Sequence, residues 1–117
     1  TLFLMSLKES KCEACTIDAP LATENQKKEF MSEIEGWQID KNAGIEQLFK
    51  IFNFRKYYDG LVFLKKVAEM AEENDHHPKL ILEWGKVEVR WWSHKIQGLH
   101  RNDFICCFKT DEIFKDF

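Results

Sequence analysis

The chain has 117 residues and a net charge of −3, with 44% hydrophobic and 32% charged residues. These values fit one globular domain of ordinary composition and do not predict a nucleic-acid-binding surface. The apolar start lacks the charged residues that open a signal peptide, and no apolar run reaches the roughly 20 residues of a membrane helix. We therefore expect a cytoplasmic protein without membrane contact.

Residues 1–22 are predicted to be an irregular lead-in, and residues 23–117 a single domain. A first helix is expected to begin after the cap residue Thr23 and to run to about Ile34, because a threonine oxygen can accept a bond from a free N–H of the first turn. Gly36 then favours the end of this helix.

Two strands should follow the first helix. Trp37 and Ile39 alternate with polar neighbours, which is typical of a strand, and residues 41–44 supply turn residues. The segment 45–54 is rich in Ile, Phe and Leu, a β-prone composition that predicts the second strand.

The clearest helix covers about residues 55–73, with Asn53 as its expected cap. Its predicted apolar stripe has alternating spacings of four and three, through Tyr57, Leu61, Leu64, Ala68 and Ala71. Pro78 prevents continuation, because proline disfavours helical geometry in the residue before it.

A hairpin and a last helix complete the chain. The hairpin alternates apolar and polar residues on both sides of a turn at Gly85-Lys86, and a helix is expected near residues 101–114. The order helix, strand, strand, helix, strand, strand, helix predicts an α+β fold. In this fold a four-stranded antiparallel sheet carries three helices packed on one face.

Four cysteines form two pairs. Cys12 and Cys15 make a CxxC motif, but no second pair at zinc-binding spacing accompanies it. Cys106 and Cys107 lie in an apolar stretch, where buried small side chains are expected. We expect reduced thiols without metal in both pairs, while a redox pair or half of a zinc site stays open as an alternative for Cys12 and Cys15.

Three of the four histidines lie between residues 76 and 94. His76 and His77 precede the third strand and His94 follows the fourth. A hairpin brings its outer ends together, so the three imidazoles should meet at one place. Three interpretations remain open: surface histidines without a role, a zinc site, or acid–base catalysis on a bound small molecule.

An acidic residue, a His-His-Pro segment, an aromatic residue, a later histidine and a closing aspartate follow one another at fixed gaps: Glu72, His76-His77-Pro78, Trp84, His94 and Asp103. With this pattern the sequence resembles the pterin-4a-carbinolamine dehydratase family, in particular its bacterial members. The similarity covers nearly the whole chain beyond the first ten residues.

This resemblance implies dehydration of 4a-hydroxytetrahydropterin, the pterin-4a-carbinolamine, to quinonoid dihydropterin, with no metal and no cofactor. The catalytic residues it implies are His76, His77 and His94. Substrate contacts carry over to His76, His77, Pro78, Ser93, His94, Lys95 and Ile96. The implied supporting residues are Glu72, Asp75, Trp84 and Asp103.

Imidazole suits this chemistry, because its ordinary pKa of about 6.5 lets it act as acid or base near neutral pH. We expect His76 and His94 to move the protons, in either order, and His77 to position the pterin. Glu72 and Asp103 could orient these rings, or could be a solvated helix residue and a helix-start residue respectively.

The expected partners are the pterin, a pterin-dependent aromatic amino-acid hydroxylase, and further copies of the chain in a dimer or tetramer. We place a two-fold interface at the strand from Lys86 to Ser93, whose outer edge should be unpaired. Val87, Val89 and Trp91 are expected to face the core, so Trp92 should point to the opposite side of the strand and lie in the interface. Alternatives are a non-catalytic regulatory protein for a hydroxylase or transcription factor, and a histidine-ligated metal hydrolase.

Overall fold

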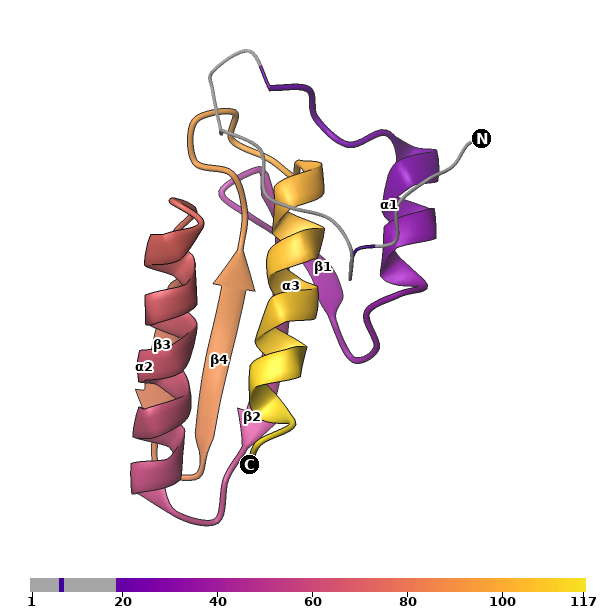
Figure 1. Ribbon diagram of the computed structural model, residues 1–117. Coiled ribbons are helices and arrows are strands. Elements are labelled where there is room, and N and C mark those ends of the chain that lie inside the picture. The colour runs from indigo at the N-terminus through magenta and orange to yellow at the C-terminus, as the bar shows by residue number, and fades with distance from the viewer. Residues whose placement is uncertain (1–6, 8–18) are drawn as a thin grey trace.

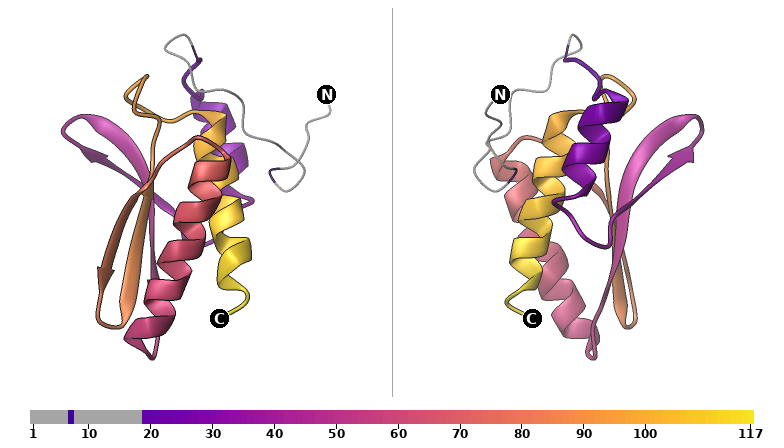
Figure 2. Two further views of the ribbon diagram at one scale, coloured as in Figure 1. Left: turned by 60° about the vertical axis from the view of Figure 1, so that its left-hand side comes forward. Right: turned by 90° about the vertical axis from the view of Figure 1, so that its right-hand side faces the viewer.

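A computed structural model describes Leu7 and residues 19–117 (Figure 1). The helices and strands are, in chain order, α1 (Glu24–Met31), β1 (Gln38–Asn42), β2 (Ile45–Asn53), α2 (Tyr57–Glu73), β3 (Lys79–Glu83), β4 (Lys86–Trp91) and α3 (Arg101–Phe114). The helices lie on one face of a four-stranded antiparallel sheet (Figure 2). The predicted α+β class and element order are confirmed.

Two further predictions concern the CxxC cysteines and a membrane-spanning helix. The interpretation of Cys12 and Cys15 falls outside the described residues. Within the described part of the chain, no helix combines the length and apolar character needed to span a bilayer.

Tight two-residue turns fix the register of both hairpins. Ala43 and Gly44 between β1 and β2 have φ of 53° and 81°, the left-handed geometry of a turn that matches the twist of paired strands. Gly85 between β3 and β4 has φ of 83°. The turn pairs Glu83 with Lys86, so the loops beyond the other ends of β3 and β4 meet.

The sheet order is β1-β2-β4-β3, and it corrects the predicted interface. β4 pairs with β2 on one side and with β3 on the other, so its backbone groups are already bonded within the chain. The prediction of a free edge from Lys86 to Ser93 is wrong. The hairpin pattern shows that β3 and β4 are neighbours, but it cannot show that β2 covers the second side of β4.

The core lies between the sheet and the helices. β4 supplies Val87, Val89 and Trp91, all fully buried, as their shared parity predicts. The facing side chains from β2, α2 and α3 are Leu48, Phe52, Phe63, Val67, Phe104, Ile105, Cys106 and Cys107. The two cysteines are free thiols, buried as expected.

The buried face of α2 differs from the predicted stripe. The residues that it buries are Gly60, Phe63, Val67, Met70 and Ala71. Tyr57 and Leu61 remain 49% and 42% exposed. The helix carries apolar residues on more than one side, so both the predicted and the observed set fit the helical period. The position of the sheet determines which set is buried.

The caps of the first two helices gave mixed results. Thr23 caps α1 as predicted, since its Oγ1 accepts from the Gln26 N–H at 3.1 Å and the Gln26 side chain accepts from the Thr23 N–H at 2.9 Å. The helix ends at Met31, one turn before Ile34. Asn53 does not cap α2: the N-cap position is Lys56, without a side-chain bond.

Candidate functional site

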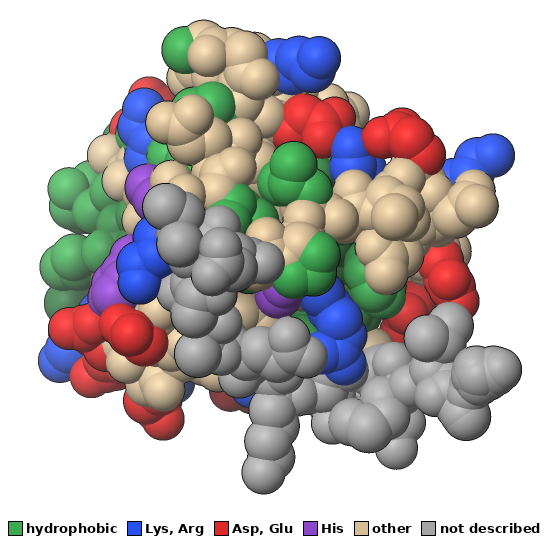
Figure 3. Space-filling model, turned by 90° about the horizontal axis from the view of Figure 1, so that it is seen from above, with side chains coloured by type: hydrophobic (Ala, Val, Ile, Leu, Met, Phe, Trp, Pro, Cys, Tyr) green, Lys and Arg blue, Asp and Glu red, His purple; other side chains and the backbone are tan. Residues whose placement is uncertain are grey.

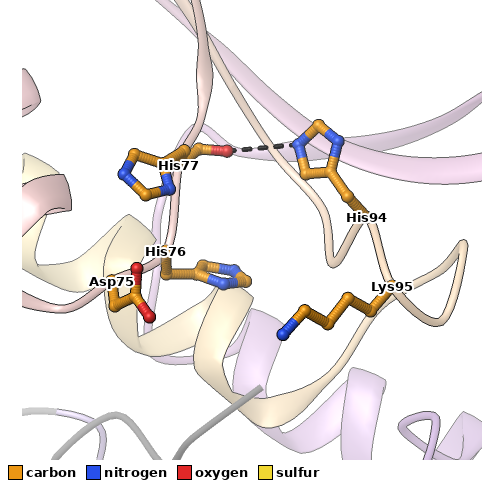
Figure 4. Close-up of a pocket in the computed structure, with 5 residues that line it drawn as sticks. All are labelled: Asp75, His76, His77, His94 and Lys95. Carbon is orange, nitrogen blue, oxygen red and sulfur yellow. Dashed lines mark hydrogen bonds between the residues drawn. The ribbon is translucent and has the colours of Figure 1, made fainter. Parts of the chain in front are cut away.

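The loop after α2 and the loop after β4 lie at the same end of the molecule. Lys79 at the start of β3 pairs with Arg90 near the end of β4, and this pairing brings the two loops together. Between them is a cavity of about 280 Å³, lined by Asp75, His76, His77, His94 and Lys95 (Figure 4). Viewed from above, histidine side chains reach the surface beside charged side chains (Figure 3).

The C-terminus of α2 fixes the first histidine. Asp75 adopts φ of 48°, a left-handed geometry that asparagine and aspartate tolerate better than most residues. The Asp75 N–H donates to the Glu72 carbonyl at 3.2 Å, and the His76 N–H donates to the Ala71 carbonyl at 3.1 Å. This is the Schellman pattern of helix termination, and it turns the chain so that the His76 side chain enters the protein.

His76 is buried, with 4% of its surface exposed. Its Nε2 donates to Asp103 Oδ1 at 2.6 Å, and its ring lies parallel to Trp91 at a centroid distance of 5.7 Å. A carboxylate that holds one ring nitrogen fixes the orientation of an imidazole and stabilises the imidazolium that forms when the ring gains a proton. His76 and Asp103 therefore have the arrangement of a proton-transfer pair.

Asp103 joins three segments of the chain. It is the third residue of α3 and is fully buried. Its Oδ2 accepts from the Ser93 hydroxyl at 2.9 Å and from the His100 backbone N–H at 2.8 Å, while Oδ1 accepts from His76. Three hydrogen-bond donors thus converge on this buried side chain in the first turn of a helix. Asp103 was expected either to orient an imidazole or to stabilise a helix start. It makes hydrogen bonds of both kinds, one to the His76 ring and one to the N-cap N–H of α3.

His77 and Glu72 form a second histidine–carboxylate pair at the surface. His77 Nε2 lies 2.6 Å from Glu72 Oε2, and both side chains are exposed. Glu72 lies in the last turn of α2, five residues before His77. Because water surrounds this pair, it contributes less to stability than the buried pair, and it can rearrange when a ligand enters.

His94 closes the other side of the cavity. Its Nε2 donates to the main-chain carbonyl of His77 at 3.2 Å, a long bond that links the two loops (Figure 4). Its ring packs at a tilt against Trp92, with centroids 4.4 Å apart. The expected meeting of His76, His77 and His94 at one place thus occurs in the structure, with Lys95 beside them.

Other residues implied by the resemblance lie away from the cavity wall. Trp84 is at the β3–β4 turn, 77% exposed, at the opposite end of the hairpin from the cavity (Figure 1). Ser93 is buried behind the cavity with its hydroxyl on Asp103. Pro78 and Ile96 belong to the two loops, but the five residues that line the cavity do not include them.

His100, the fourth histidine, supports Asp103 from behind the cavity lining and was not singled out from the sequence. It is the N-cap of α3, and its Nδ1 accepts from the Asn102 N–H at 3.1 Å while its own N–H donates to Asp103. Histidine is uncommon at an N-cap, where Ser, Thr, Asp and Asn are preferred. The signal available in the sequence was its position directly before the predicted start of α3.

Among residues 19–117, no group of three or more His, Cys, Asp or Glu side chains is placed to hold a metal ion. The three histidines of the cavity turn their ring nitrogens to separate partners: a carboxylate of α3, a carboxylate of α2 and a main-chain carbonyl. In the described chain, the bonded ring nitrogens of these three histidines therefore point to three different groups and do not converge on one point.

Known proteins match this chain over most of its length. The family model for pterin 4 alpha carbinolamine dehydratase matches residues 19–113. The chain belongs to the pterin-4-alpha-carbinolamine dehydratase family. A provisionally named family member from Vibrio vulnificus is 50% identical over 109 residues, which cover 93% of this chain and 99% of the relative. Another, from Marinobacter nauticus, is 44% identical over 95% of this chain and all of the relative.

Solved structures agree with the family assignment. A protein from Brucella melitensis, described as a transcriptional coactivator/pterin dehydratase, has a TM-score of 0.72 and 28% identity, and the match covers 80% of this chain and 98% of that one. A pterin dehydratase-like RuBisCO assembly factor of the alpha-carboxysome has a TM-score of 0.57 at 20% identity, and the match covers 68% of this chain and 89% of that one. The second likeness shows a shared fold only.

Proposed function

We propose that this protein dehydrates 4a-hydroxytetrahydropterin to quinonoid dihydropterin by histidine acid–base catalysis, in the recycling of tetrahydropterin. The observation that carries this proposal is the buried His76–Asp103 pair beside His77 and His94 at one cavity. Family membership supplies the substrate class. The site supplies groups that can give and take protons near neutral pH.

The reaction breaks the bond between C4a and its hydroxyl oxygen. A general acid protonates the departing hydroxyl, which leaves as water, while a general base removes the proton of N5. The electron pair of the N5–H bond then forms the C4a–N5 double bond. No electrons are gained or lost overall, so the chemistry requires one acid and one base in reach of the pterin.

In its imidazolium form, which becomes neutral imidazole when it gives up a proton, His94 suits the role of the acid. Its Nε2–H points across the cavity entrance to the His77 carbonyl at 3.2 Å, so the oxygen of a bound hydroxyl can take over this long bond at little cost. His76 suits the role of the base, because Asp103 stabilises the imidazolium that forms when His76 receives the N5 proton. We assign His77, held by Glu72, to positioning of the pterin.

The test is a stopped-flow assay on chemically prepared 4a-hydroxytetrahydropterin. We expect the protein to dehydrate this compound faster than buffer does, and addition of a chelator to leave the rate unchanged. Loss of activity together with stoichiometric zinc would favour a histidine-ligated hydrolase instead. Folded protein that leaves the rate at the buffer value would favour the second candidate function.

That second candidate is a binding role without catalysis. It is supported by the Brucella melitensis neighbour, which is described as a coactivator as well as a dehydratase. In both cases we propose a cytoplasmic homodimer or tetramer, with a pterin-dependent aromatic amino-acid hydroxylase as a partner. Sedimentation at micromolar concentration tests the assembly, since a single species at the chain mass of 14.0 kDa would contradict it.

A further inference from the structure

Trp92 has an unusual position at the end of β4. Trp91, the last residue of β4, is fully buried in the core. Trp92 follows directly, is half-buried and packs against the core. It is not among the residues that line the cavity.

The side chain that Trp92 contacts is a proposed proton-transfer group. The indole and the His94 imidazole have centroids 4.4 Å apart and an interplanar angle of 32°. A single residue, Ser93, separates Trp92 from His94 in the sequence, and its hydroxyl donates inward to Asp103. The backbone therefore directs Trp92 and His94 to the same side, where the two rings meet.

The backbone that carries His94 is itself fixed. Ser93 and Gly98 form an isolated antiparallel bridge, with the Ser93 N–H donating to the Gly98 carbonyl at 2.9 Å and the reverse bond at 3.4 Å. Gln97 adopts φ of 51°, which closes the loop between them. This framework sets the Cα position of His94 but leaves its exposed ring to rotate unless side-chain contacts restrain it.

Among the described residues, two contacts restrain that ring: the face of Trp92 and the long bond from Nε2 to the His77 carbonyl. A 3.2 Å bond at an exposed position is weak and must be given up when a substrate oxygen replaces the carbonyl. The aromatic contact does not compete with the substrate, because it uses the ring face and not a ring nitrogen. It can therefore hold His94 before and during the reaction.

We infer that Trp92 is a positioning residue, whose indole ring holds the His94 imidazole with Nε2–H directed across the cavity. This inference rests on the proposed function, in which His94 moves a proton. The charged and titratable groups around His94 on the cavity wall are Asp75, His76, His77 and Lys95, with Glu72 bonded behind His77. Trp92 is uncharged, so its substitution alters the orientation of His94 without changing these groups.

A double-mutant cycle separates this role from a contribution to folding. Trp92→Leu keeps an apolar side chain but removes the aromatic face, and we expect it to lower kcat about three- to tenfold while KM changes less than about twofold. In a His94→Ala background the same substitution should change kcat by less than about 1.5-fold. Trp92→Phe, which keeps an aromatic face, should retain kcat within about twofold of the unmodified protein. Equal losses in both backgrounds, or no rescue by phenylalanine, would overturn the inference.

A second readout does not depend on activity. Nitrogen NMR of the His94 ring distinguishes the two neutral tautomers, and we expect Nε2–H to dominate in the unmodified protein and in Trp92→Phe, with averaging in Trp92→Leu. An unchanged tautomer ratio in Trp92→Leu would reject the role of Trp92. A buffer-level dehydration rate of the unmodified protein would instead reject the proposed function, whatever the NMR shows.

Discussion

His76 and His94 lie on the same cavity but in opposite surroundings. His76 is buried, bonded to a buried carboxylate and parallel to a core tryptophan. His94 is exposed and is held by one long bond to a carbonyl and one tilted ring contact. The position of His76 thus depends on the fold, whereas that of His94 depends on local surface contacts. Substitution of His76 should therefore lower the stability of the fold more than substitution of His94.

The largest expected effect is loss of either of these two histidines. His76→Ala and His94→Ala should each lower the turnover rate at least about tenfold, within the usual range for a missing general acid or base. Only His76→Ala should also lower the free energy of unfolding, by about 1–3 kcal/mol, because it removes a donor from buried Asp103.

Stopped-flow turnover and urea unfolding measure the two quantities separately. His94→Ala is the matched control for stability, since it removes an imidazole of the same size from the same cavity. Equal losses of unfolding free energy in the two variants would contradict the contrast between buried His76 and exposed His94. Full turnover in both variants would contradict their roles in proton transfer.

Asp103→Asn should lower turnover by about tenfold or more. The amide cannot stabilise an imidazolium as a carboxylate does, and its NH₂ group would face one of the three donors that now point at Asp103. The matched control is Asp111→Asn on the same helix, where the carboxylate accepts from Trp37 and Lys50. Asp111→Asn should affect stability but keep kcat per folded molecule within about twofold, and a comparable loss of kcat would show that the Asp103 result reflects folding.

His77→Ala should mainly weaken binding. We expect KM to rise about three- to tenfold with kcat within about threefold, because His77 is assigned to the pterin and not to proton transfer. Glu72→Gln should produce a smaller rise in KM, since it removes only the partner of His77. Steady-state kinetics tests both substitutions, and a turnover loss in His77→Ala larger than in His76→Ala would reverse the assigned roles.

The smallest expected effect concerns Cys107, a buried thiol of α3. Burial raises the pKa of the Cys107 thiol well above its ordinary value, and the nearby Asp103 and Asp111 charges act in the same direction. A neutral, buried thiol is a poor nucleophile. Iodoacetamide should therefore label Cys107 in urea but not in the folded protein at neutral pH, as mapped by mass spectrometry. Labelling in the folded state would show that the core around α3 opens to solvent.

Local sequence patterns predicted the parts of the fold that are determined locally. The alternation in β4 correctly placed Val87, Val89 and Trp91 in the core, and the hairpin logic brought His94 to His76 and His77. The pairing of β2 with β4 was not predicted, because strand order depends on contacts between segments distant in sequence. The expected free edge and the Trp92 interface placed on it depended on that missing contact.

The site shows the same division. The Schellman turn at Asp75 and the cap at His100 depend on backbone geometry that residue types alone do not specify, and His100 was missed for that reason. The link between His76 and Asp103 spans 27 positions, so the sequence could suggest a tuning role for Asp103 but not its three donors. Trp84 fits the family pattern, yet the hairpin places it at the far end from the cavity.

The central claim is that histidines of this cavity carry out the dehydration by proton transfer. The most direct test compares the protein, treated with chelator, and its His76→Ala/His94→Ala variant in the same stopped-flow assay on 4a-hydroxytetrahydropterin. We predict that the unmodified protein accelerates the reaction with or without chelator, and that the folded double variant leaves the rate near that of buffer. A double variant as fast as the unmodified protein would contradict the claim.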